Sequence, residues 1–125
     1  MRTDLKDKRS FHIKRLFSSF RFAGNGLKLA LSEPNMRVHI AAGILISAAG
    51  FIFELTRTEW CVLLLTIAGV MSLEMVNTAI EKTVDLVTEE YRPLAKMAKD
   101  LAAGAVLLFA IAAVTIGCLL FIPKL

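Results

Sequence analysis

The feature that most constrains this chain is residues 101–122, a run of 22 residues without a single Asp, Glu, Lys or Arg. A helix of that length crosses the roughly 30 Å hydrocarbon core of a bilayer. Two earlier apolar runs, at about 36–55 and 60–80, have a similar character. The 56% apolar content is too high for an ordinary soluble domain of 125 residues. The sequence therefore predicts an all-α membrane protein with spans at about 36–55, 60–80 and 99–122.

The basic residues are distributed unevenly, and this predicts the orientation of the spans. Nine of the fifteen Lys and Arg residues precede Val38, and four more lie in the 81–100 connection. The turn at 54–59 and the C-terminus hold one each. Since cytoplasmic loops are enriched in Lys and Arg, the N-terminus and the 81–100 connection are expected inside and the C-terminus outside. The asymmetry also favours a lipid-facing basic end over a nucleic-acid site.

The region before the first span divides into two expected segments. Residues 1–10 are charged and poor in apolar side chains, which predicts a disordered tail. Residues 11–31 alternate aromatic and aliphatic with basic side chains, which is typical of an amphipathic helix lying in the membrane interface. Gly24-Asn25-Gly26 is expected to break or bend that helix. It either anchors the chain only or also covers an active site, and residues 32–125 form one three-span domain.

The polar residues that could take part in a reaction are concentrated at the end of the second predicted span. Glu74, Asn77 and Glu81 follow at i, i+3 and i+7, so they share one helix face. A carboxylate inside a span indicates a functional site by default. Two carboxylates about 10 Å apart on one face can divide the roles of general base and metal ligand. The alternative is that Glu74 only makes an interhelical hydrogen bond that holds the bundle together.

Further charged residues are expected at the same side of the membrane. Glu33, Glu81, Lys99 and Asp100 fall at the cytoplasmic ends of the predicted spans. Carboxylates suit Mg²⁺ and a lysine suits phosphate, so such a site could join a soluble phosphate donor to a lipid hydroxyl. Taken alone, Lys99 and Asp100 are better explained as a solvated helix start with an interfacial lysine. The glycine-rich nucleotide motifs of soluble enzymes are absent, so these residues by themselves indicate only a membrane protein with an acidic cytoplasmic site.

A resemblance extends this interpretation. The pattern Glu74-x-x-Asn77-Thr-Ala-Ile-Glu81, followed by Asp85, Glu90-Tyr91 and Ala98-Lys99-Asp100, resembles the signature of the bacterial diacylglycerol kinase family. The resemblance covers about residues 14–122, and the block 77–100 looks most like the Gram-positive branch associated with undecaprenol kinase activity. It implies ATP- and Mg²⁺-dependent phosphorylation of a lipid alcohol by a homotrimer in the bacterial cell membrane.

The resemblance also implies roles for individual residues. Glu74 matches the family's catalytic base, and Glu33 and Glu81 match its two metal-coordinating glutamates. Asn77 and Arg37 would support that site, whereas Asp85 would either support it or simply be exposed. The residues that match the nucleotide site are Arg15, Glu33, Glu81, Glu90, Lys99 and Asp100.

Two alternatives remain open at this point. The lipid could be diacylglycerol, giving phosphatidic acid, because both lipids present one hydroxyl at headgroup level. The chain could instead be a small oligomeric transporter that uses Glu74 for ion coupling. A transporter would need that charge to face a pathway open to both sides in turn. The polar groups gather at one interface, and this favours the enzyme.

Overall fold

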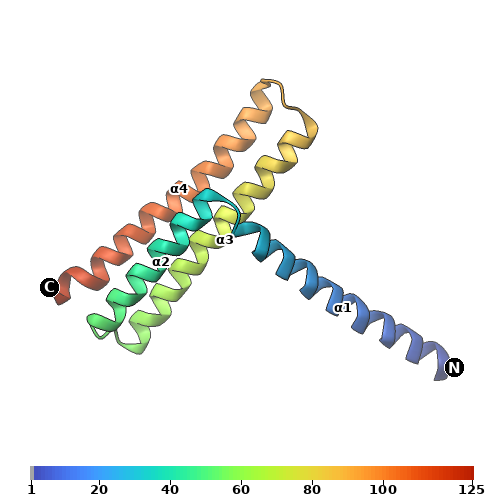
Figure 1. Ribbon diagram of the computed structural model, residues 1–125, viewed down its shortest axis with the longest axis horizontal. Helices are drawn as coiled ribbons and strands as arrows, with labels where there is room; N and C mark the ends of the chain where they lie inside the picture. Colours follow the sequence, from blue (N-terminus) through green and yellow to red (C-terminus); the bar gives the residue numbers. More distant parts are fainter. Residues whose placement is uncertain (1) are drawn as a thin grey trace. The chain divides into compact units, whose positions relative to one another are not determined.

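The computed structural model describes residues 2–125, with side chains from Ser10 onward, and over this range it is all-helical without a strand (Figure 1). The helices are α1 (Arg2–Ala30), α2 (Pro34–Ile52), α3 (Arg57–Val87) and α4 (Pro93–Phe121), followed by the 3₁₀ turn η1 (Ile122–Lys124). The chain divides into an N-terminal unit, residues 1–34, and a second unit, residues 35–125. The all-α prediction is confirmed.

Helix α1 starts earlier than the sequence predicts and is not interrupted at its glycines. Residues 2–10, expected to be a disordered tail, form its first turns. They contain neither Gly nor Pro, and five of the nine are Leu, Lys or Arg, which favour helix. The helix also passes through Gly24-Asn25-Gly26 without a break, and neither glycine has a positive φ. Gly lowers helix stability by about 1 kcal/mol relative to Ala but does not by itself end a helix.

The second unit contains the predicted membrane spans. Helices α2, α3 and α4 are each long and apolar enough to cross a bilayer, which confirms the prediction of three. With 31 residues, α3 is about 46 Å long and exceeds the hydrocarbon thickness by several turns. It ends at Val87 and α4 begins at Pro93, whereas the expected spans end near 80 and begin near 99. In Figure 1 the extra length of α3 and α4 forms the tip of a hairpin, which extends past the N-terminal end of α2.

Small residues lie at the contacts that α3 makes with its two neighbouring helices. Gly69 of α3 faces the ring of Phe109 on α4, and a Cβ at this position would collide with that ring. A Cβ at Gly43 of α2 would lie 3.2 Å from the Ile67 side chain of α3. Small residues let helix backbones approach closely in a membrane, where the hydrophobic effect does not drive helices together. Helix α3 therefore contacts both α2 and α4.

The connection between α2 and α3 is fixed by its own polar groups. Thr56 caps α3: its hydroxyl accepts from the Glu59 backbone N–H (3.3 Å), and its own N–H donates to the Glu59 carboxylate (2.7 Å). Glu59 also pairs with Lys124 near the C-terminus, with 3.2 Å between Nζ and Oε2. This capping box satisfies donors that the first turn of a helix otherwise leaves unpaired.

Candidate active site

The predicted polar face of α3 is present in the structure, and two of its three residues are buried. Glu74 is 4% exposed and Asn77 is 6% exposed, although both are polar. The Asn77 side-chain amide donates to Oε1 of Glu81 at 3.3 Å. Its other atom, Oδ1, is buried and has no hydrogen-bond partner. A buried oxygen without a donor is costly, so it marks a position where a ligand could be bound.

A histidine from the neighbouring helix lies beside the buried glutamate. His39 of α2 places Nε2 3.9 Å from Oε2 of Glu74, and its side chain is 25% exposed against 5% for Glu74. This distance is longer than a direct hydrogen bond but within the range of an ion pair. The sequence pattern around His39 does not indicate this contact. Its approach to Glu74 depends on how α2 and α3 pack.

His39 also lies at one end of an apolar groove formed by α2, α3 and α4. The groove has a volume of about 670 Å³ and extends from His39 and Met71 to Phe53 and Leu125. Thr66 is a polar side chain in its lining, and its hydroxyl donates to the Val62 carbonyl of its own helix at 2.7 Å. The groove therefore offers an apolar surface whose polar end is next to Glu74.

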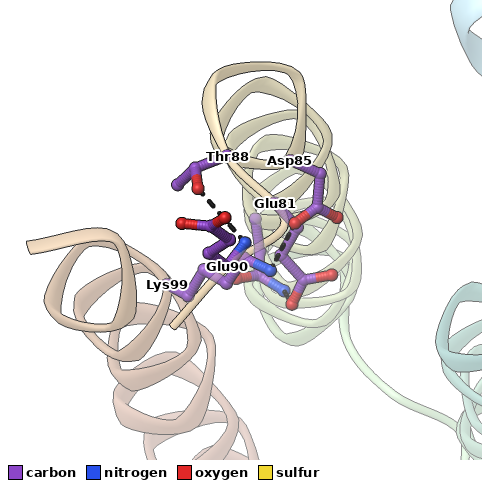
Figure 2. Close-up of polar contacts among 6 residues, drawn as sticks. Glu81, Asp85, Thr88, Glu90 and Lys99 are labelled. Carbon is purple, nitrogen blue, oxygen red and sulfur yellow. Dashed lines mark hydrogen bonds and ion pairs between the residues drawn. The ribbon is translucent and has the colours of Figure 1, made fainter. Parts of the chain in front are cut away.

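A second, polar pocket of about 330 Å³ occupies the tip of the α3–α4 hairpin. Lys99 reaches from α4 to Asp85 on α3, with 2.6 Å between Nζ and Oδ1, and Figure 2 shows this pair beside Glu81. The loop is ordered by the Thr88 hydroxyl, which accepts from the Glu90 N–H at 3.1 Å (Figure 2). The charged residues that line the pocket are Asp85, Glu89, Glu90, Arg92, Lys96, Lys99 and Asp100.

Six of the seven charged residues of this pocket form ion pairs with one another but remain accessible to water. Lys96 pairs with Asp100 one turn further along α4, and Arg92 lies 3.8 Å from Glu90. The Lys99 side chain is 39% exposed and that of Asp85 is 52% exposed. Exposed ion pairs contribute little to stability, typically about 0–1 kcal/mol. A lysine held this weakly can exchange its carboxylate partner for a phosphate group at small cost.

Comparison with known proteins identifies the family. The family model for prokaryotic diacylglycerol kinase matches residues 21–121. The chain belongs to this family. It is 49% identical over 123 residues to the undecaprenol kinase of Bacillus subtilis (strain 168), covering 98% of this chain and 99% of the relative.

Diacylglycerol kinases of the family match as well. That of Synechocystis sp. (strain PCC 6803) is 46% identical over 88% of this chain and 64% of its own length. That of Escherichia coli (strain K12) is 30% identical over 85% of this chain and 88% of its own length. Membership confirms the prediction of an integral-membrane lipid kinase.

The family residues expected from the sequence are divided between the two units. The hairpin and the adjoining part of α3 hold most of them: Glu74, Asn77, Glu81, Asp85, Glu90, Lys99 and Asp100. Arg37 lies in the first turns of α2 and is exposed. Arg15 and Glu33 belong to the N-terminal unit, where Arg15 is exposed and Glu33 is half-buried.

Sequence reasoning assigned no site role to two residues that the structure brings into these clusters, Lys96 and His39. The i, i+4 spacing of Lys96 and Asp100 could have revealed the first pair. No local spacing could have revealed the approach of His39 to Glu74, because the two residues are on different helices.

Proposed function

We propose that this chain is an ATP-dependent kinase that phosphorylates undecaprenol to undecaprenyl phosphate. The observation that carries the proposal is the buried carboxylate of Glu74, on the same helix face as Asn77 and Glu81. The similarity to an undecaprenol kinase along nearly the whole length of both chains supports this lipid. Diacylglycerol is the second candidate acceptor, because several relatives carry that name.

Glu74 is proposed as the general base. Phosphoryl transfer to an alcohol needs a group that accepts the hydroxyl proton as the new O–P bond forms. A carboxylate shielded from water by α2, α3 and α4 is suited to a hydroxyl that arrives on an apolar chain. The groove that ends at His39 offers such a chain an apolar path toward Glu74.

Glu81 and Glu33 are proposed to hold Mg²⁺. Among the residues whose side chains are described, no three His, Cys, Asp or Glu gather as a ready-made metal site. Magnesium is commonly bound by only one or two carboxylates, together with water and substrate phosphates. The Glu81 carboxylate and the unpartnered Oδ1 of Asn77 are oxygen ligands of the kind that Mg²⁺ binds. The ion would neutralise phosphate charge as it is transferred.

The hairpin pocket is proposed to bind the nucleotide. Lys99 would leave Asp85 for a phosphate, and Asp100 and Glu90 would contribute from the same pocket. Arg15 and Glu33 of the N-terminal unit are proposed as further nucleotide-binding residues, with Arg37 as a supporting cation. Asp85 would then act by holding Lys99 in place before ATP binds.

The arrangement in the membrane is also proposed. Residues 11–31 would lie in the interface, because α1 exposes large apolar side chains (Phe17 is 73% exposed) between basic ones. The hairpin and N-terminus would be cytoplasmic and the C-terminus outside, in the bacterial cell membrane, as the Lys and Arg distribution predicts. Residues 32–125 would form the kinase domain and assemble as a homotrimer.

The test is transfer of labelled γ-phosphate in detergent micelles, with undecaprenol and diacylglycerol offered separately. Glu74→Gln should lower transfer by about 100- to 10,000-fold, the range attributed to general-base catalysis. Glu54→Gln is the matched control, since Glu54 is an exposed residue of the α2–α3 connection, outside the proposed machinery. Label mainly on diacylglycerol would overturn the proposed lipid. No transfer to either lipid by folded protein with Mg²⁺ present would overturn the kinase activity itself.

A further inference from the structure

We propose that His39 is a positioning residue for Glu74, and that it receives the proton that Glu74 takes from the lipid hydroxyl. This inference rests on the proposed function of Glu74 as the base. Burial of Glu74 creates a difficulty for catalysis, because its side chain is 5% exposed and a proton accepted there has no direct route to water. A base that stays protonated cannot act in the next turnover.

Among the described side chains near Glu74, His39 is the one suited to accept its proton. His39 comes from α2, so it approaches the carboxylate from a different helix than Asn77 and Glu81. Along the face of α3 itself, Glu81 lies two turns further on and is linked to Asn77. From Leu101 to Phe121, α4 contains no titratable side chain apart from Cys118, which lines the far part of the groove.

The exposure of His39 is intermediate between that of Glu74 and that of the surface. At 25% exposed, the imidazole can exchange a proton with water while Nε2 stays 3.9 Å from the carboxylate. Catalytic contacts are often long in the absence of substrate and shorten in the substrate complex. Histidine is also the side chain that gains and loses a proton most readily near neutral pH. These properties suit an intermediary between a buried base and water.

The proton can be followed through the reaction. The lipid O–H bond breaks as its oxygen forms a bond to the γ-phosphorus, and the bond from that phosphorus to the ADP oxygen breaks. The proton moves to Oε2 of Glu74 and then to Nε2 of His39. His39 releases it to water, so the net products are phosphorylated lipid, ADP and one proton. No further reactant is required.

The experiment uses the full-length chain in undecaprenol micelles and compares three variants. His39→Gln keeps a hydrogen-bonding side chain but cannot carry the proton, and kcat should fall about 10- to 100-fold with the KM for ATP unchanged. His39→Ala should show a similar loss, and added imidazole should restore part of kcat, increasingly as pH rises and more imidazole is neutral. His12→Gln, at an exposed histidine of α1, should retain wild-type kcat.

Several outcomes would overturn the inference. Wild-type kcat in His39→Gln at every pH would do so. Loss of kcat in His39→Ala without imidazole rescue, in protein that melts and binds ATP like wild type, would reduce His39 to a packing residue. In the Glu74→Gln background, His39→Gln should cause little further loss, because the two residues act in series. Failure of the proposed function would look different, since wild-type protein would then transfer no phosphate to undecaprenol.

Discussion

Helix α3 carries two acidic clusters that are satisfied to different degrees. At its start, Thr56 and Glu59 satisfy each other in a capping box, and Lys124 closes the cluster at 3.2 Å. Further along, Glu74 is buried with its nearest cation-forming group at 3.9 Å, and Asn77 keeps an oxygen without a partner. The same helix thus has one cluster whose polar groups bond to one another and one cluster whose polar groups can still accept further hydrogen bonds.

The different degree of hydrogen bonding indicates a structural role for the first cluster and a functional role for the second. Polar groups that are fully paired stabilise a turn and have little left to offer a ligand. Buried polar groups that are incompletely paired lower stability, and they persist where a substrate or metal completes them. Substitutions in the first cluster should therefore lower stability and spare activity, and those in the second should lower activity without lowering stability.

After Glu74→Gln, the largest effect is expected for Glu81→Gln. Loss of a proposed metal-binding carboxylate should lower kcat/KM on the order of 100-fold, as removal of a charge-stabilising group commonly does, and raise the Mg²⁺ concentration needed. Because Glu81 is exposed, the melting temperature should stay within a degree or two. The measurement is phosphate transfer over a Mg²⁺ titration, with Glu59→Gln as the control of equal charge. Equal losses in the two variants would remove the distinction between the clusters.

Asn77→Leu should move activity and stability in opposite directions. Leucine removes the buried oxygen that lacks a partner, so the free energy of unfolding should rise by about 1 kcal/mol. Activity should fall at least 10-fold, because Asn77 no longer orients Glu81. Denaturant unfolding in mixed micelles and the transfer assay measure the two quantities, with exposed Asn35→Leu as control. A large loss of stability would show that Asn77 is structural after all.

Thr56→Ala tests the satisfied cluster. Loss of the N-cap hydroxyl should lower the free energy of unfolding by about 1 kcal/mol and leave kcat unchanged. Thr58→Ala, two residues along in the same turn, should change the unfolding free energy less, because Thr58 is not the cap. A fall in kcat for Thr56→Ala at unchanged stability would contradict the structural role.

The smallest effect is expected for Lys124→Met. The Lys124–Glu59 pair is partly exposed, so its removal should lower the free energy of unfolding by no more than about 1 kcal/mol. That loss should shrink as salt is added, because salt screens the wild-type pair. Unfolding measured at low and high ionic strength checks this. A loss that does not depend on salt would indicate that Lys124 acts through packing.

The sequence by itself determined the three spans and the polar face of α3. Both follow from local properties: an uncharged run longer than the bilayer core partitions into lipid, and the 3.6-residue period puts Glu74, Asn77 and Glu81 on one side. The apolar runs did not predict where the helices begin and end. Apolar length reports the thickness of the membrane, whereas α3 continues in its charged residues to Val87 and α4 already begins at Pro93.

Only the tertiary structure decided which groups meet. Lys99 pairs with Asp85 across 14 residues because the hairpin brings α4 back along α3. His39 approaches Glu74 because α2 and α3 are neighbours, with Gly43 of α2 beside the Ile67 side chain of α3. Likewise, the Asn77 oxygen is buried by neighbouring helices and not by any local pattern. Contacts between helices depend on their relative register and rotation, which the period of a single helix does not determine.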